Sequence, residues 1–248
     1  MSEAKSYRML AARLNYMSQD NPMLQYSAKE ACRSMSNPAV GDFMKIKRVV
    51  RFLKGLGKAQ LRYPMQSEEE SRQITTYVDS DWAGCTKTRR STSGGVMKVG
   101  RHVLRTWSST QPTIATSSGE AELIAISDGA ARSLGMKTVM TEMGINPTLK
   151  VLRMFADSSV AKSFASTRGL GNMRHLDVKL LWLQECVQRG RLSVGKVSGA
   201  TNVADAMTKY QDVKKLRELC DPHGICSGPD GGSTIGPRGG VNSSGACP

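Results

Sequence analysis

The stretch that decides the fold is QITTYVDSDWAGCTKTRRSTSGGVMKVGRHVLRTWS, residues 73–108. It contains three short strand-like runs, at Ile74–Asp79, Gly94–Val99 and His102–Ser108. Glycine and polar residues separate these runs, and the connections are short enough for hairpins. The stretch therefore predicts three antiparallel strands of one sheet.

Downstream of this stretch, helical and strand-like segments alternate. The expected helices are Ser117–Glu142, Ser158–Ser166, His175–Gln188 and Thr201–Leu219, and the expected strands are Val151–Ala156 and Leu192–Val197. Hairpin strands followed by alternating helix and strand predict an α/β fold, with a five-stranded mixed sheet flanked by helices.

The chain before the hairpin strands has a helical period. Turn signals at Asp20–Pro22 and Ser36–Pro38 divide it into three expected helices. We expect a small helical appendage over residues 1–66 and an α/β domain over residues 73–219. Residues 220–248 are rich in Gly, Ser and Pro and have few apolar residues to bury, so we expect a disordered tail there.

The charge of the chain favours nucleic acid as a partner. The net charge is +14, and a phosphate backbone is the commonest ligand that balances such a charge. Lys47, Arg51, Lys54 and Lys58 recur along one face of the third expected helix. Two interpretations of this face remain: a solvated surface with extended cationic side chains, or a helix that lies on phosphates.

Other features of the composition indicate an intracellular protein, cytoplasmic or nuclear, without a membrane partner. No run of eighteen apolar residues occurs, and the N-terminus lacks the apolar stretch of a signal peptide. The six cysteines are spread along the chain without the density of a disulfide scaffold.

Four acidic residues are candidates for one site. The aspartates at expected strand ends or early in the last helix are Asp79, Asp157 and Asp205. Ser117 to Glu120 fits a capping box in which Glu120 folds back onto the N-cap amide, which leaves Glu122 as the free acid of that helix. Converging carboxylates repel one another unless cations lie among them, and all-oxygen ligation suits Mg²⁺ or Mn²⁺. Taken singly, each acid could instead be a turn, strand-end or helix-start residue.

Short motifs surround these acids along the chain. They are YVDSDWAG (77–84), RSTSGG (90–95), WSSTQP (107–112), ATSSGEAE (115–122), FADS (155–158), RHLD (174–177) and NVADAMTK (202–209). In this order they resemble the ribonuclease H domain of copia-type retrotransposons. The upstream motifs YRML (7–10), MSNP (35–38) and KRVVRFLKG (47–55) resemble the segment that joins reverse transcriptase to ribonuclease H in these polyproteins.

The resemblance implies a ribonuclease H-like fold and endonucleolytic hydrolysis of the RNA strand of an RNA–DNA hybrid. It implies two Mg²⁺ ions, with Mn²⁺ as a substitute, held by Asp79, Glu122, Asp157 and Asp205. Selectivity for the hybrid would come from contacts to 2′-hydroxyl groups. The reverse transcriptase palm of a full-length polyprotein is a further expected partner. We expect no polymerase activity, because the palm is missing from this sequence.

Departures from the family pattern support an alternative. Ser158, Gly119 and Leu123 stand where the family commonly has asparagine, threonine and an aromatic residue. None of these changes removes a metal ligand, but they keep open a catalytically decayed fragment that at most binds nucleic acid. A third interpretation is a module that only tethers a polymerase subunit.

One histidine and three tryptophans also have two interpretations. His175 is either a satisfied core or helix-start histidine or a substrate contact. Trp82, Trp107 and Trp182 each adjoin an apolar run, so we interpret them as core residues and not as platforms for base stacking.

Overall fold

The fold is that of a computed structural model, which describes residues 3–145, 151–159, 163 and 178–228. The expected helix at Ser158–Ser166 and the start of the one at His175–Gln188 lie largely outside these residues. In the described part of the chain, no helix combines the length and apolar character needed to cross a bilayer.

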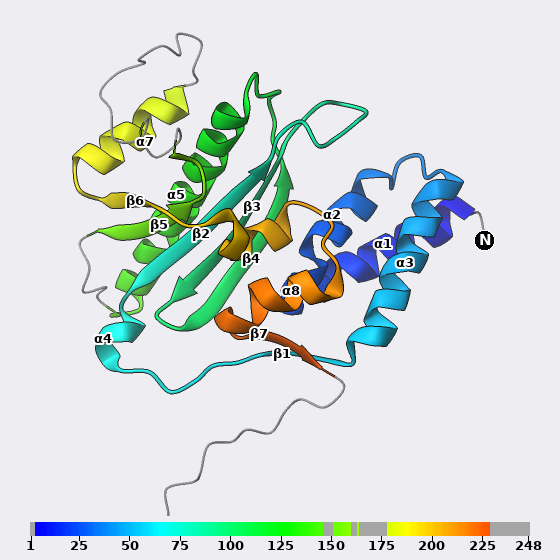
Figure 1. Cartoon of the computed structure of the whole chain (residues 1–248), viewed down its shortest axis with the longest axis horizontal. Coiled ribbons are helices and arrows are strands. Elements are labelled where there is room, and N and C mark those ends of the chain that lie inside the picture. The colour runs from blue at the N-terminus through cyan, green and yellow to red at the C-terminus, as the bar shows by residue number, and fades with distance from the viewer. Residues whose placement is uncertain (1–2, 146–150, 160–162, 164–177, 229–248) are drawn as a thin grey trace, which may run out of the picture.

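A five-stranded mixed sheet forms the centre of the fold (Figure 1). Its strands are β2 (Ile74–Asp81), β3 (Thr92–Val99), β4 (His102–Thr110), β5 (Leu152–Ala156) and β6 (Leu192–Lys196). The order across the sheet is β4-β3-β2-β5-β6. The first three strands are antiparallel, whereas β5 and β6 run parallel to β2. The predicted mixed sheet is therefore confirmed.

Helices α5 (Ser118–Glu142) and α7 (Val178–Gln188) cover one face of the sheet. Gly129 allows α5 to approach closely, because a Cβ atom there would lie 2.6 Å from Val78 Cγ1. A hydrogen bond of 2.8 Å joins the hydroxyls of Thr76 and Ser133 across the same interface. This close packing brings the first turn of α5 to the end of β2.

The other face carries the 3₁₀ turn η3 (Val203–Met207) and helix α8 (Val213–Cys220). The sequence predicted one helix over Thr201–Leu219, which is wrong: η2 (Gly199–Thr201), η3 and α8 share this stretch. The reason is two N-caps in one segment. Asn202 caps η3 by accepting from the Ala204 N–H, and Asp212 caps α8 by accepting from the Lys215 N–H at 2.8 Å.

Order in the described residues extends past Cys220, where the sequence predicted that a tail begins. The turn η4 (Asp221–His223) ends at Gly224, whose φ of 81° is a left-handed conformation that glycine adopts readily. Strand β7 (Ile225–Gly228) then pairs antiparallel with β1 (Lys58–Leu61). Ile225 packs into the core of the α8 face, and this burial together with the strand pairing accounts for the additional order.

The N-terminal region forms the three predicted helices, α1 (Glu3–Asp20), α2 (Gln25–Arg33) and α3 (Val40–Leu56), with the 3₁₀ turn η1 (Pro22–Leu24) between the first two and the short α4 (Glu68–Ser71) further on. The Tyr7 hydroxyl donates to the Ala31 carbonyl at 2.8 Å and joins α1 to α2. Met23 and Leu56 pack with the core of the α8 face, so this region adjoins the sheet domain. Lys58 belongs to β1 and not to α3, because the backbone leaves the helical conformation at Gly57.

Candidate metal centre

Parallel pairing places two aspartates side by side. Tyr77 of β2 lies opposite Phe155 of β5. Two residues further along each strand are Asp79, near the end of β2, and Asp157, directly after β5. Since parallel strands end at the same edge of a sheet, the two carboxylates meet there.

Glu122 reaches this edge from helix α5, which covers one face of the sheet. Ser117 caps α5 by accepting from the Glu120 N–H at 3.1 Å. Glu120 accepts from the backbone N–H and hydroxyl of Thr116, one residue before the predicted partner, each at 2.6 Å. Glu122, half a turn further on, points toward β2 and accepts from the Ser80 N–H at 3.1 Å.

Three carboxylates form a cluster at this edge. One oxygen each of Asp79, Glu122 and Asp157 lies within 4.8 Å of the others. Asp79 and Glu122 are only 4% and 8% exposed. Glu122 Oε2 is buried without a hydrogen-bond partner among the described residues. The cluster therefore concentrates negative charge away from water.

Burial and mutual repulsion shift both buried acids toward the protonated form. Burial raises the pKa of Asp79 to about 6, although the Thr208 hydroxyl opposes this shift. Burial raises the pKa of Glu122 to about 8, and the charges of Asp79 and Asp157 add to the effect. Such shifts are expected of carboxylates that share a site without a compensating cation.

Asp205 lies beside this cluster and is not a member of it. It is in η3, is 8% exposed, and its charge contributes to the raised pKa of Asp79. Its carboxylate forms an ion pair with the Lys209 ammonium and accepts from Gln211 Nε2 at 2.5 Å. The structure thus brings three of the four predicted acids together. The fourth lies nearby, paired with the Lys209 ammonium.

Three further residues position the acids and were not predicted. The Thr208 hydroxyl donates to Asp79 Oδ2. Asn202 is fully buried, and its Nδ2 donates to the Val78 carbonyl at 2.9 Å, which ties η3 to β2. A Cβ at Gly94 would lie 2.7 Å from atoms of Met207 and Thr208, so glycine permits η3 to approach β3. All three residues lie within the quoted motifs, and an asparagine directly before a buried turn is a capping signal.

The four basic residues predicted to bind nucleic acid do not all lie on one helix. Lys47, Arg51 and Lys54 are exposed on α3, and Lys58 is exposed on β1. His175 lies outside the described residues.

The prediction for the tryptophans is correct for two of the three. Trp107 is 5% exposed, and Trp182 packs partly buried against the core of the α5 face. Trp82 is 49% exposed, so its interpretation as a core residue is wrong. Its Nε1 donates to the Ala115 carbonyl at 3.1 Å, which holds the ring at the surface beside the end of β2.

The order of the strands and the acids at their ends define a protein with a ribonuclease H-like fold. A solved structure of a foamy viral protease-reverse transcriptase in complex with an RNA/DNA hybrid has a similar fold. The superposition covers 84% of this chain and 27% of the viral chain, with a TM-score of 0.50 and 10% sequence identity. No protein-family model matches the chain.

Curated relatives identify the family. A retrovirus-related Pol polyprotein from transposon RE1 of Arabidopsis thaliana is 24% identical over 209 residues, which are 84% of this chain and 14% of that protein. An uncharacterized mitochondrial protein of the same plant is 32% identical over 130 residues, 52% of each chain. The chain belongs to the Pol polyproteins of copia-type retrotransposons and contains their ribonuclease H domain. It spans about half of the mitochondrial relative and a small part of the transposon polyprotein.

Proposed function

We propose that this chain hydrolyses the RNA strand of RNA–DNA hybrids by a two-metal-ion mechanism, as the ribonuclease H part of a retrotransposon polyprotein. The observation that supports the proposal most strongly is the cluster of Asp79, Glu122 and Asp157, of which the first two are buried. A protein interior does not retain three adjacent carboxylates, one of them with an unpartnered oxygen, for packing alone.

The donor set fits divalent cations. All three clustered groups offer oxygen atoms, and hard ions such as Mg²⁺ and Mn²⁺ prefer oxygen ligands. Asp79, Glu122 and Asp157 would hold the ions, with Asp205 as the fourth ligand. When bound, two such ions supply the charge for an in-line displacement at a phosphodiester.

The protein's own groups prepare the ligands for this role. The Thr208 hydroxyl and the Ser80 N–H fix one oxygen each of Asp79 and Glu122. The Lys209 ammonium neutralises Asp205 while no cation is bound there. Oriented ligands of this kind need little rearrangement when an ion binds.

The net charge of the chain and its similarity to retrotransposon Pol polyproteins support an RNA–DNA hybrid as the substrate. The net charge of +14 suits a polyanion, and selectivity for a hybrid would depend on contacts to the 2′-hydroxyls of the RNA strand. A catalytically decayed fragment that at most binds nucleic acid is the second candidate. The ion pair of Lys209 with Asp205 favours it, since this pair keeps the fourth acid outside the cluster.

The test is cleavage of a labelled RNA–DNA hybrid in Mg²⁺ by the wild-type chain and by Asp79→Asn. We expect Asp79→Asn to lower the rate by at least about 100-fold, because it removes charge stabilisation of the transition state. Hybrid affinity should stay within several-fold. Glu120→Gln is the control, because Glu120 contacts Thr116 at the start of the same helix and lies outside the cluster. Turnover of Asp79→Asn at the wild-type rate would refute the site, and a wild-type chain that binds Mg²⁺ in calorimetry without cutting would establish the decayed fragment.

A further inference from the structure

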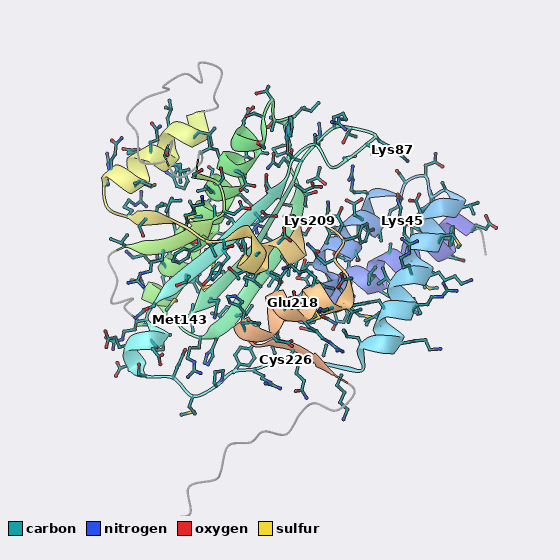
Figure 2. The ribbon with its side chains drawn as sticks, in the orientation of Figure 1. Lys45, Lys87, Met143, Lys209, Glu218 and Cys226 are labelled. Carbon is teal, nitrogen blue, oxygen red and sulfur yellow. The ribbon has the colours of Figure 1, made fainter. Side chains whose placement is uncertain are left out.

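A cavity of about 230 Å³ lies between α2, α3 and the segment after η3. We call it the tyrosine pocket, and its lining includes Tyr26, Arg48, Phe52, Lys209 and Tyr210. Lys209 and Gln211 line it and also contact the Asp205 carboxylate, so the pocket adjoins the candidate metal centre. Figure 2 shows Lys209 beside the sheet and Lys45, which also lines the pocket, on the helical side.

Aromatic rings make up part of the wall of the tyrosine pocket. Tyr26 and Tyr210 pack edge to face, with ring centroids 4.8 Å apart and an interplanar angle of 83°. Tyr210 is 55% exposed although it is large and partly apolar. Phe52 is half-buried in the same wall. An exposed aromatic surface of this kind offers a platform for a flat ring.

Cationic side chains line the same cavity. Lys45, Arg48 and Lys209 contribute to the lining, and the described residues that line it include no aspartate or glutamate. Lys45 pairs with Asp42 at 3.0 Å, and Lys209 pairs with Asp205. Arg48 forms no ion pair with a described residue, so its guanidinium is available to an anion. A ligand with both a flat ring and a negative charge matches this combination.

We propose that the tyrosine pocket binds one unpaired nucleotide of a nucleic-acid strand that extends from the metal centre. The base would stack on the exposed ring of Tyr210, and its phosphate would contact Arg48. The cavity is smaller than the roughly 300–1,000 Å³ typical of pockets for drug-sized ligands, which suits a single unit and excludes a duplex. The inference rests on the proposed function, because the strand reaches the pocket from the metal centre.

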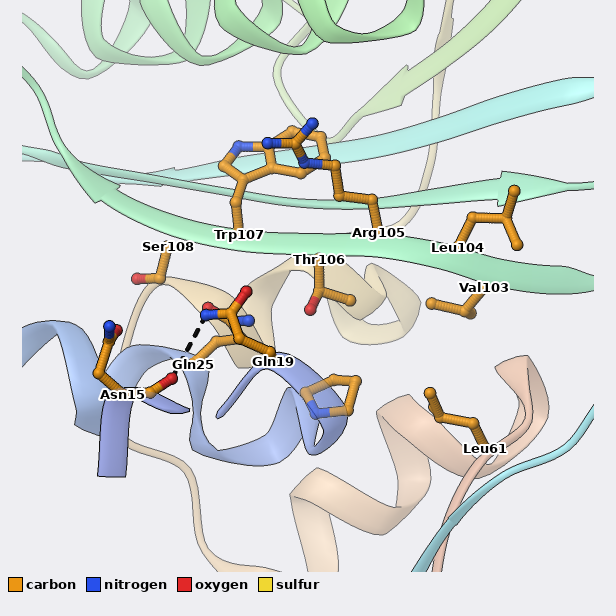
Figure 3. A pocket seen from close by; sticks show the side chains of 11 residues that line it. Asn15, Gln19, Gln25, Leu61, Val103, Leu104, Arg105, Thr106, Trp107 and Ser108 are labelled. Carbon is orange, nitrogen blue, oxygen red and sulfur yellow. Dashed lines mark hydrogen bonds between the residues drawn. The ribbon is translucent and has the colours of Figure 1, made fainter. Parts of the chain in front are cut away.

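A second cavity provides a contrast. It has a volume of about 300 Å³, lies between α1, η1 and β4, and is lined by the amides of Asn15, Gln19 and Gln25. Figure 3 shows the Arg105 side chain beside Trp107, on the other side of β4 from these amides. Among the described residues that line this cavity, Arg105 is the only cation, and none of the candidate acids takes part. Neither feature supports a phosphate-bearing ligand there.

The test is fluorescence anisotropy of the full chain in EDTA, with a blunt RNA–DNA hybrid and with the same hybrid carrying a single-stranded overhang on either strand. We expect the wild-type chain to bind an overhang hybrid about 5- to 10-fold more tightly than the blunt one, because base stacking on aromatic side chains is worth at least this much. Arg48→Gln and Tyr210→Ala should remove most of this preference, whereas Tyr210→Phe should retain it.

Arg51→Gln is the matched control, since Arg51 is exposed on α3 but does not line the pocket. It should weaken binding to both hybrids equally. Thermal unfolding checks that each variant folds. Equal affinity of the wild-type chain for blunt and overhang hybrids would overturn the pocket assignment and leave the proposed function standing. This result is expected if the pocket holds a protein segment. An overhang preference without any cleavage in Mg²⁺ would refute the proposed function and leave the pocket assignment standing.

Discussion

Neutralising Glu122 should stabilise the metal-free protein at neutral pH and abolish its response to Mg²⁺. The pKa of this carboxyl is about 8, against 4.5 in solution, and its Oε2 atom has no partner among the described residues. Between these two pH values the folded protein retains a proton that the unfolded chain has released. Stability is therefore highest below pH 4.5, falls as the pH rises toward 8, and is constant above it.

The size of the effect follows from the same pKa. At about 1.4 kcal/mol for each pH unit, Glu122 lowers the free energy of unfolding by about 3 kcal/mol at pH 7 and by about 5 kcal/mol above pH 8. Asp79, with a pKa of about 6 against 3.8, acts in the same direction at lower pH. The two acids repel each other, so the measurable quantity is the joint slope of stability against pH. The amide side chain of Glu122→Gln has no proton to release in this pH range, so the substitution should flatten most of this slope.

The assay is urea denaturation of the wild-type chain and Glu122→Gln in EDTA, between about pH 5 and pH 8. The control is Glu120→Gln, which should cost up to about 1 kcal/mol through the helix cap and leave the slope unchanged. Adding Mg²⁺ should stabilise the wild-type chain by mass action and leave Glu122→Gln unaffected. A flat pH dependence of the wild-type chain, or a Glu122→Gln variant no more stable than the control near pH 8, would refute the reasoning.

Three further changes probe the residues that hold the acids. Asn202→Ala should cost about 2–4 kcal/mol in urea denaturation, because it removes the hydrogen bonds to two buried backbone groups, and a loss below 1 kcal/mol would contradict this. Gly94→Ala should cost about 1–3 kcal/mol, because its Cβ would meet Met207 at 2.7 Å, and wild-type stability would show that η3 moves freely. Thr208→Val should weaken Mg²⁺ binding about 10- to 100-fold in calorimetry by removing the hydrogen bond to Asp79, and unchanged affinity would exclude that role.

The sequence predicted the sheet because its signals are local. Strand-like runs within residues 73–108, spaced closely enough for hairpins, are sufficient to specify two hairpins. The parallel register then follows from sheet geometry, and it places Asp79 beside Asp157 without further information. The meeting of these two acids was therefore predictable, whereas the exact partner of Glu120 was not, because Thr116 and Ser117 both offer an N–H to a glutamate side chain.

Errors arose where local and distant signals compete. Residues 201–219 have an apolar period that suggests one helix, but Asn202 and Asp212 each cap a new element. Asn202 is also held by a hydrogen bond to the carbonyl of Val78, in a strand far away in sequence. The pairing of β1 with β7 is equally non-local, and only Gly57 and Gly224 indicate that the chain turns at those points. A prediction based on period alone does not include such contacts.

The candidate metal centre depends on both faces of the sheet. Glu122 comes from α5 on one face, whereas Asp205 comes from η3 on the other. The η3 turn packs with α8 in a core that also contains Met23 and Leu56 from the N-terminal region. The position of Asp205 therefore rests on the helical segment that precedes the ribonuclease H domain in the sequence. The appendage and the domain that the sequence separates near residue 66 form one packing unit at this surface, and Asp205 keeps its place beside the cluster only while that shared core is intact.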